Sequence, residues 1–488
     1  MIDWLPTANR SSDWPQARVC IAGLGASGFS AADVLLHYGA QVRVIEGADS
    51  PSLQDKAHLL EILGAEVTLG APEATLPDCD LVITSPGWRP NHPILAAATA
   101  RGIPIWGDVE LAWRFQQPDR IVPWLAVTGT NGKTTTVTML ESILRAAGLT
   151  TSAVGNVGRP ILETVLDEVA YDVLAVELSS FQLHWAPSLS LHSAAVLNLE
   201  PDHLEWYETL APTPAAAYAA DKARIYHQVT NSCIYNVEDP TTEQMVVDAD
   251  VVEGARAIGF TLGVPGPSML GVVDDYLVDR AFIPQRRDSA LELALIEDLP
   301  SSSPHMIANA LAAAGLARSF GVSARAVREG LRNYELGPHR IETIASQAGV
   351  TWVDDSKATN AHAALAAIES FESVILIAGG LAKGTRFEQM VRQGRGRIKA
   401  ALLIGADRGV VAEAFASEAD EVPTFVFDCL EPQVMTAVVA RAGELAQPGD
   451  TVLLAPACAS QDIFVDYADR GDQFARAVRT FLTPQGGD

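Results

Sequence analysis

The sequence predicts a three-domain α/β protein, and three observations indicate this class. The chain has 488 residues, which is too long for one ordinary core and predicts two to four domains. Short apolar runs typical of buried strands alternate with longer amphipathic runs typical of helices. Several of these strands end in glycine-rich or polar turns, so candidate binding residues gather at the carboxyl ends of predicted strands.

The first domain is predicted over residues 1–111. Residues 18–23 predict a buried strand, 27–39 a helix and 41–47 a second strand, joined as a right-handed β-α-β unit. The turn at residues 23–28 reads GLGASG, and Glu46 ends the next strand. This pattern is typical of dinucleotide sites, but also of other nucleotide sites and of plain helix–strand packing. The residues alone leave these three interpretations open.

The second domain, residues 112–335, opens with a strand, the loop TGTNGKTTT and a helix. The helix is predicted to end near Gly148 and to bury one face, formed by Val137, Leu140, Ile143, Leu144 and Ala147.

The loop resembles a shortened P-loop. It lacks the first glycine of the usual spacing but keeps Gly132, Lys133 and Thr134. Backbone N–H groups at the start of the helix would hold a phosphate, Lys133 would add charge, and the Thr134 hydroxyl would ligate Mg²⁺. The alternative is a plain strand–turn–helix connection with a surface lysine.

Two further strand ends of this domain carry polar residues. Glu177 ends the strand predicted within 171–180, and Asp202 and His203 follow the strand that begins near residue 192. Adjacent strand ends beside a phosphate loop favour metal ligation over isolated solvated side chains. Residues 240–304 predict an irregular β excursion, and 305–319 a helix.

The third domain is predicted over residues 336–488. A strand ends in Asp354, Asp355, Ser356 and Lys357 and then opens a helix. Capping explains the small polar residues, but a lysine at the positive end of a helix is better explained by a shared anion. Other polar residues at the junction and at strand ends are His339, Arg340, Lys383 and Ser460.

Composition excludes several classes of protein. The formal charge of −26 disfavours nucleic acid as a partner. No apolar run is long enough to cross a membrane, and the first residues show no secretion signal. The five cysteines, Cys20, Cys79, Cys233, Cys429 and Cys458, are scattered and support neither a disulfide framework nor a zinc site. We therefore expect a cytoplasmic protein.

Nine motifs occur in one order along the chain and together resemble the Mur ligase family from residue 18 to about residue 481. They are TGTNGKTT, GNVG at 155–158, VELSSFQL, DH at 202–203, DKARIY, PHRIE, DDSKATN, GG…K and APACAS…D…RG…F. DSKATN together with PACAS resembles the branch of the family that adds D-glutamate.

The resemblance implies a Rossmann-like N-terminal domain that holds a UDP substrate, a P-loop ATPase-type central domain that holds ATP and two Mg²⁺ ions, and a Rossmann-like C-terminal domain that brings the amino acid. It implies ligation of D-glutamate to UDP-N-acetylmuramoyl-L-alanine through an acyl phosphate, by a monomer. It also implies a carbamate on Lys222, which on its own sequence context would be a surface residue.

The resemblance assigns the site residues by motif. Those for ATP are Gly129, Thr130, Asn131, Gly132, Lys133, Thr134, Thr135, Asn309, Arg340 and Asp355. Those for the UDP substrate are Gly25, Ala26, Ser27, Glu46, Asn156 and Ser179, and those for D-glutamate are Lys357, Thr359, Lys383, Ser460 and Tyr467. Lys133, Glu177, His203 and Lys222 are the catalytic set, and Thr134, Glu177, His203 and Lys222 the metal set.

Four positions depart from the family pattern: Glu46, Met306, Gln461 and Tyr467. None of them is a phosphate or metal ligand. Competing interpretations are a sibling ligase that adds another amino acid, a folylpolyglutamate synthase, a nucleotide-dependent dehydrogenase and a non-catalytic P-loop protein. DSKATN argues against the first two, and the phosphate loop argues against a simple dehydrogenase.

Overall fold

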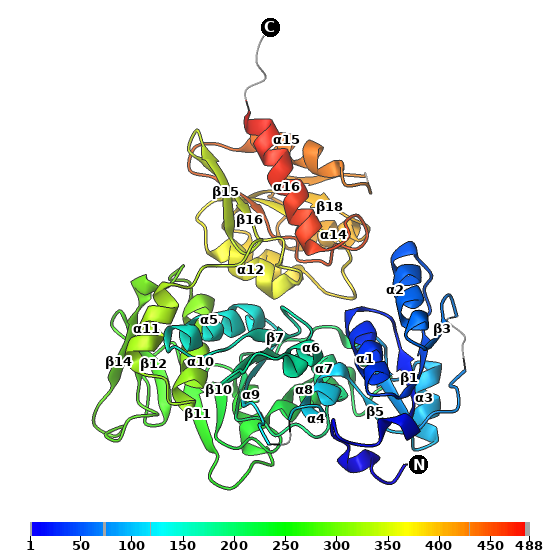
Figure 1. The fold of residues 1–488 in the computed structure, drawn as a ribbon. Coiled ribbons are helices and arrows are strands. Elements are labelled where there is room, and N and C mark those ends of the chain that lie inside the picture. Colours follow the sequence, from blue (N-terminus) through cyan, green and yellow to red (C-terminus); the bar gives the residue numbers. More distant parts are fainter. Residues whose placement is uncertain (1, 72–74, 118, 429, 484–488) are drawn as a thin grey trace. The chain divides into compact units, whose positions relative to one another are not determined.

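The computed structural model describes residues 2–71, 75–117, 119–428 and 430–483, in two compact units divided between Tyr334 and Glu335 (Figure 1). Cys429 lies outside the described residues, and the other four cysteines are buried and free. Three sheets with covering helices confirm the predicted α/β class. In the described part of the chain, no helix is long and apolar enough to cross a membrane.

The first sheet is parallel and has the strand order β3-β2-β1-β4-β5. Its strands are β1 (Arg18–Ala22), β2 (Gln41–Ile45), β3 (Glu66–Thr68), β4 (Leu81–Thr84) and β5 (Ile105–Trp106). The helices are α1 (Ala26–His37), α2 (Pro51–Ile62), α3 (Pro93–Ala100) and α4 (Asp108–Arg114). The GLGASG turn therefore joins the central strand β1 to α1, as predicted.

The second sheet lies in the same unit and has the order β14-β13-β12-β11-β10-β9-β6-β8-β7. Its strands are β6 (Trp124–Thr128), β7 (Ala153–Gly155), β8 (Leu174–Glu177), β9 (Ser193–Val196), β10 (Ser232–Asn236), β11 (Arg256–Phe260), β12 (Met269–Val273), β13 (Tyr276–Asp279) and β14 (Leu291–Leu295). Strands β6 to β12 run parallel, so the carboxyl ends of β6, β8 and β9 meet at one edge.

The helices of this region are α5 (Lys133–Ala146), α6 (Ile161–Leu166), α7 (Ser180–His184), α8 (Pro214–Ala223), α9 (Pro240–Val247), α10 (Pro304–Ser319) and α11 (Ala324–Arg332). Helix α5 buries four of its five predicted core positions, but Ala147 is exposed because the helix has already ended there. The β excursion is confirmed by β11 to β14. Helix α9, which begins at Pro240 with Asp239 as its cap, was missed.

The second unit contains a sheet with the order β15-β16-β20-β17-β18-β19, parallel except for the β15–β16 pair. Its strands are β15 (Glu342–Gln347), β16 (Val350–Asp354), β17 (Val374–Gly379), β18 (Ile398–Ile404), β19 (Thr424–Val426) and β20 (Thr451–Leu454). Its helices are α12 (Ala361–Glu369), α13 (Glu388–Gly394), α14 (Arg408–Glu418), α15 (Val434–Leu445) and α16 (Tyr467–Leu482).

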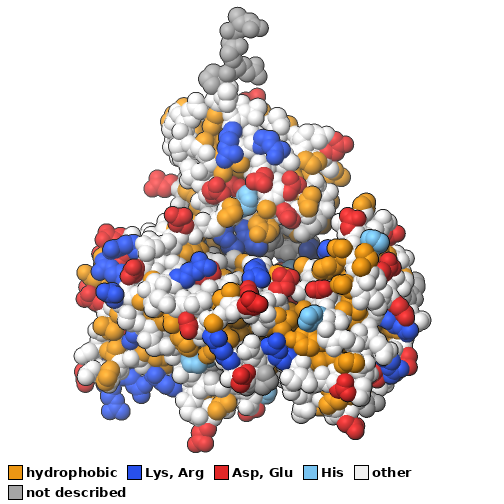
Figure 2. Space-filling view, in the orientation of Figure 1, with side chains coloured by type: hydrophobic (Ala, Val, Ile, Leu, Met, Phe, Trp, Pro, Cys, Tyr) orange, Lys and Arg blue, Asp and Glu red, His pale blue; other side chains and the backbone are white. Residues whose placement is uncertain are grey.

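Alternate residues of these strands belong to two separate cores. Leu376 and Leu453 pack in one cluster, whereas Ile375, Ile377 and Val452 pack in the other. Both faces of the sheet are thus covered, which explains why its strands read as continuous apolar runs. On the face of the molecule shown in Figure 2, acidic side chains are scattered among basic ones.

Candidate active site

The phosphate loop lies between β6 and α5 and depends on glycine. Gly129 and Gly132 both have positive φ, 155° and 83°. A Cβ atom on Gly132 would lie 2.3 Å from Asn309 Oδ1, so the loop and the Asn309 side chain pack directly together. The predicted ATP residue Asn309, which comes from α10, is therefore brought to the loop. The Lys133 ammonium folds back and donates to the carbonyl oxygens of Gly129 (2.8 Å) and Thr130 (2.9 Å).

Asn198, which follows β9, holds the loop from the neighbouring strand end and was missed by the sequence. Its Oδ1 accepts from the backbone N–H groups of Thr130 (3.0 Å) and Asn131 (2.9 Å), and its Nδ2 donates to the Asn131 carbonyl (3.2 Å). The hydroxyl groups of Thr130 and Tyr218 lie 2.9 Å apart and add a second anchor. The signal that could have pointed to Asn198 is a polar residue two positions after a buried strand.

Lys222 is buried, which its alanine-rich context does not suggest. Only 2% of its surface is exposed, its Nζ donates to the Gly129 carbonyl (2.7 Å), and the ring of Tyr218 lies 4.7 Å away. Burial lowers the pKa of Lys222 well below its ordinary value, and the charge of Lys133 lowers it further, against the opposing charges of Asp202 and Glu177. Helix α8 thus brings this amine to the phosphate loop.

Glu177, at the end of β8, is 2% exposed, and only one of its two carboxylate oxygens has a hydrogen-bond partner among the described residues. Its Oε1 accepts from Asn156 Nδ2 (2.8 Å), whereas its buried Oε2 has no hydrogen-bond partner among the described residues. A buried carboxylate oxygen without a donor fits a cation as its missing partner. The predicted metal set therefore fits Mg²⁺ in the chemistry of its donors: a hydroxyl, a carboxylate, an imidazole and an amine that could carry a carbamate.

The other members of this set lie on neighbouring segments. The side chain of Thr134, in the first turn of α5, is half-buried. His203 has a positive φ of 52°, and its Nε2 lies 3.6 Å from a carboxylate oxygen of Asp202. Ser179 Oγ accepts from Gln182 N (3.2 Å) and caps α7. Ser179 and the Asn156 backbone both lie at the strand end marked by Glu177.

The turn of the first sheet holds the predicted UDP residues together. A Cβ on Gly28 would lie 1.9 Å from the Gly23 carbonyl, so α1 packs closely on the turn. The Glu46 carboxylate accepts from the backbone of Leu24 (2.8 Å) and Ala48 (3.0 Å). Glu46 thus fixes the shape of the turn. Lys56 Nζ, 3.5 Å from the Leu24 carbonyl, is a cation at this turn that the sequence did not point to.

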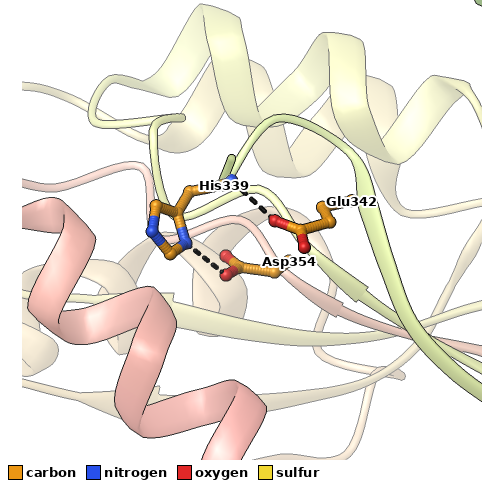
Figure 3. Close-up of side chains that lie close together, drawn as sticks. All are labelled: His339, Glu342 and Asp354. Carbon is orange, nitrogen blue, oxygen red and sulfur yellow. Dashed lines mark hydrogen bonds and ion pairs between the residues drawn. The ribbon is translucent and has the colours of Figure 1, made fainter. Parts of the chain in front are cut away.

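In the second unit, His339 and Asp354 form a buried pair, with His339 Nδ1 2.7 Å from Asp354 Oδ2 (Figure 3). The His339 N–H donates to Glu342 (3.0 Å), and Ser356 N donates to Asp354 (2.8 Å). Burial raises the pKa of the Asp354 carboxyl, and the bond to His339 opposes that shift. The side chains of His339, Glu342 and Asp354 are close enough to share a cation, but each already accepts or donates a hydrogen bond within the cluster.

This cluster lies beside the predicted ATP residues Arg340 and Asp355. His339 and Ile341 both have positive φ, 62° and 48°, so the backbone on each side of Arg340 is held in an unusual conformation. Ile341 N donates to Asp355 Oδ1 (3.3 Å). Burial raises the pKa of Asp355 to about 7, and the charge of Arg340 acts in the opposite direction.

Four of the predicted D-glutamate residues lie on three loops, and the fifth, Tyr467, begins α16. One buried arginine ties two of these loops together. Arg470 donates through Nε and Nη2 to Ser356 Oγ (2.9 Å) and O (2.8 Å), and through Nη1 to the Cys458 carbonyl (3.0 Å). Burial lowers its pKa to about 10. Arg470 itself was not assigned a role from the sequence.

Around this arginine, Lys357 Nζ lies 4.0 Å from the ring centre of Tyr467. Leu381 and Ala459 exchange backbone hydrogen bonds, which joins the loop of Lys383 to the loop of Ser460. Thr359 N donates to the Lys357 carbonyl (2.8 Å). The structure thus places Lys357 with Tyr467, and the Lys383 loop with the Ser460 loop.

Three family models match separate parts of this chain. They are the Mur ligase MurD-like N-terminal domain at residues 17–107, the Mur ligase middle domain at 127–317 and the Mur ligase glutamate ligase domain at 339–458.

Similar curated proteins match almost end to end. A protein of Streptomyces coelicolor is 56% identical, with 96% of this chain and 99% of the relative covered. One of Thermobifida fusca is 50% identical, with 95% and 98% covered. Both are named UDP-N-acetylmuramoylalanine–D-glutamate ligase.

Solved structures share the fold at low identity. The MurF ligase of Thermotoga maritima in complex with ADP superposes with a TM-score of 0.56 at 16% identity, with 99% of both chains covered. The UDP-N-acetylmuramate-alanine ligase MurC of the same organism gives the same TM-score and identity, covering 95% of this chain and 100% of that one. Together with the family models and the close relatives, this likeness establishes that the chain belongs to the Mur ligase family.

Proposed function

We propose that this protein is the ATP-dependent ligase that joins D-glutamate to UDP-N-acetylmuramoyl-L-alanine in peptidoglycan synthesis. The observation that carries the proposal is the convergence of the phosphate loop, buried Lys222 and half-satisfied Glu177 at one sheet edge. The substrate pair follows from relatives of that name at 56% and 50% identity, together with the DSKATN stretch.

The chemistry needs an activated carboxylate, because a free carboxylate is a very poor acyl donor at neutral pH. The L-alanine carboxylate of the UDP substrate attacks the γ-phosphorus of ATP, which gives an acyl phosphate and ADP. The amine of D-glutamate then attacks the acyl carbon, and inorganic phosphate leaves as the amide forms. The protein contributes positioning and neutralisation of charge.

The P-loop residues Gly129 to Thr135 bind the ATP phosphates. Backbone N–H groups of the loop donate to phosphate oxygens, and Lys133 turns from the Gly129 and Thr130 carbonyls toward them. Asn309 binds the adenosine part of ATP from beside Gly132, and Arg340 and Asp355 are proposed for the same nucleotide.

Thr134, Glu177, His203 and a carbamate on Lys222 would hold two Mg²⁺ ions, which would neutralise charge on the phosphates. The carbamate is supported by the position of the Lys222 amine, buried beside the carbonyl of Gly129 and near the charges of Glu177 and Asp202. A carbamate would turn the buried amine into an anionic ligand, and the positive charge of the Mg²⁺ ions would offset the cost of burying that anion.

The remaining residues select the substrates. Gly25, Ala26, Ser27 and Glu46 form the UDP turn, and Asn156 and Ser179 contact the muramoyl-alanine end. Lys357, Thr359, Lys383, Ser460 and Tyr467 receive the carboxylates of D-glutamate. The UDP turn, the P-loop and the D-glutamate residues belong to domains at 1–111, 112–335 and 336–488, respectively. The protein acts as a cytoplasmic monomer with no nucleic-acid or membrane partner.

The test is ADP release with ATP, Mg²⁺ and UDP-N-acetylmuramoyl-L-alanine, offering D-glutamate, L-glutamate, L-alanine, L-lysine or meso-diaminopimelate in turn. Release with D-glutamate alone supports the proposal. Release with another amino acid would keep the ligase chemistry and replace the substrate, with Gln461 beside the Ser460 loop as the first residue to examine. No release with any of them would contradict the proposed acceptor.

A further inference from the structure

A buried acid lies behind the UDP turn. Asp108 is the first residue of α4, is 5% exposed, and accepts through Oδ2 from the Ser27 hydroxyl at 2.7 Å. Its buried Oδ1 has no hydrogen-bond partner among the described residues. Burial raises the pKa of this carboxyl group, whereas the bond from Ser27 and the backbone N–H groups of Val109 and Asp108 act in the opposite direction.

Ser27 also lies in the turn proposed for the UDP substrate, and it is only half-buried. It is the second residue of α1, whose first-turn N–H groups point out of the helix end. No atom lies within 4 Å of a Cβ built on Gly25, so the turn is open on that side. Ser27 thus joins the buried acid to the turn where the diphosphate is proposed to bind.

A serine hydroxyl has only one proton to donate. While Asp108 is ionised, that proton goes to Oδ2, and Ser27 can present only lone pairs to a phosphate. If Asp108 is neutral, the direction of the bond reverses: the acid donates to Ser27 Oγ, and the Ser27 hydroxyl donates to the phosphate. A diphosphate nearby also favours the neutral acid, because like charges repel.

We propose that Asp108 takes up one proton from solvent when the diphosphate of the UDP substrate binds at the α1 turn. The neutral carboxyl group then donates to Ser27 Oγ, and the Ser27 hydroxyl donates to a phosphate oxygen. Asp108 is thus a positioning residue that acts through Ser27. The inference rests on the proposed function, because that function supplies the diphosphate.

Other charged groups belong to the elements around this pair. The titratable and charged side chains on α1, α2, α6, α7, the end of β2 and α4 itself are Asp33, His37, Asp55, Lys56, His58, Glu61, Glu163, His184, Glu46, Glu110 and Arg114. Glu110 is paired with Arg114, His184 with Asp221, and Glu46 with the turn backbone. Ser27 is the neighbour whose side chain donates a hydrogen bond to Asp108.

The test is calorimetric titration of the full-length protein with UDP-N-acetylmuramoyl-L-alanine, without ATP, in buffers of different ionisation enthalpy from about pH 6.5 to about pH 8. The ligand's diester phosphates and carboxylate stay ionised over this range. The dependence of the heat on the buffer gives the number of protons taken up, independently of the affinity. The Asp108→Asn variant keeps a side-chain N–H donor for Ser27 and cannot titrate. Asp33→Asn, an exposed position on α1, is the matched control for net charge.

The wild type and Asp33→Asn should take up close to one proton at the upper pH, and their affinity should fall by up to about tenfold per pH unit. Asp108→Asn should take up none and keep a flat affinity that exceeds the wild type's at the upper pH. Wild-type binding without proton uptake would overturn the inference alone, as would unchanged uptake in Asp108→Asn. No binding of this ligand under any of these conditions would instead overturn the proposed UDP site.

Discussion

The ammonium group of Lys222 lies 2.7 Å from the carbonyl oxygen of Gly129, so a residue of α8 is joined directly to the phosphate loop. The two residues are 93 positions apart in the chain. The contact connects the proposed carbamate ligand with the loop that would hold the phosphates. It is also where stability and function make opposite demands, because a buried amine costs free energy in the absence of ligands.

Lys222→Met should therefore separate activity from stability. Methionine fills a similar volume without the amine, so the thermal unfolding midpoint without ligands should stay equal or rise. The rate of ADP release should fall by at least about 100-fold, the order of loss seen when one group that stabilises transition-state charge is removed. Near-normal turnover by a folded Lys222→Met protein would contradict the proposed role.

Glu177→Gln tests the metal site. The amide oxygen can still accept from Asn156, and Oε2 has no hydrogen-bond partner to lose, so the fold should be preserved. Loss of the charge should raise the Mg²⁺ concentration required for half-maximal ADP release by at least about tenfold. Glu163→Gln, an exposed position on α6, is the control. Superimposable Mg²⁺ curves for the two variants would count against Glu177 as a ligand.

Asn198→Ala tests the clamp on the phosphate loop. The change removes three hydrogen bonds to Thr130 and Asn131, and the loop should then lose part of its preorganised shape. We expect the KM for ATP to rise by about tenfold or more, with little change in the KM for D-glutamate. Asn333→Ala, at the exposed end of α11, should behave as the wild type. Equal increases in both KM values would instead point to a distortion that reaches beyond the phosphate loop.

Asp355 should make stability fall as pH rises. Its pKa is about 7 in the folded protein, above the value of about 3.9 expected when unfolded. Between these values the folded state binds more protons, so its stability decreases up to about pH 7 and then levels off. Asp355→Asn removes this loss. The unfolding free energy of the variant minus that of the wild type should therefore increase by about 1–3 kcal/mol between pH 5 and pH 8.

The readout for this variant is the difference in unfolding midpoint between variant and wild type at each pH, because other groups titrate in both proteins. Asp420→Asn, an exposed position in the same unit, should show no such trend. A difference that stays constant from acid to alkaline pH would show that Asp355 does not titrate as its burial implies.

Lys357→Met tests the amino-acid pocket. The ammonium that lies over the Tyr467 ring would be lost, and we expect the KM for D-glutamate to rise by about tenfold or more, the scale of one charge-assisted hydrogen bond. The KM for ATP should change little. Arg441→Met removes a cation from α15, where it pairs with Glu444, and should alter neither value. An unchanged KM for D-glutamate would remove Lys357 from the pocket.

Much of the fold could be predicted because local pattern and fold agree. Apolar runs became the strands of three sheets, and their polar ends gathered at one edge because parallel strands end together. Lys222 could not be found from its own neighbours, because alanine flanks suggest a surface helix and only the distant Gly129 shows its burial. Asn198 and Asp108 were missed for the same reason: their partners lie 67 or 68 and 81 positions away. Helix α9 was missed because the surrounding strands dominated the pattern.

Gly471 limits how the proposed amino-acid pocket can evolve. A Cβ at this position would lie 2.2 Å from His339 Nδ1 and 2.5 Å from Asp354 Oδ2, so α16 allows no larger residue where it passes this pair. Arg470, next to it, is engaged with Ser356 and Cys458. Mutations that change the preferred amino acid are therefore expected on the loops of Lys357 and Lys383, while the helix behind them tolerates little variation. We therefore expect few resistance mutations against an inhibitor that binds the backbone of the Ser356 and Cys458 loops, which Arg470 holds in place.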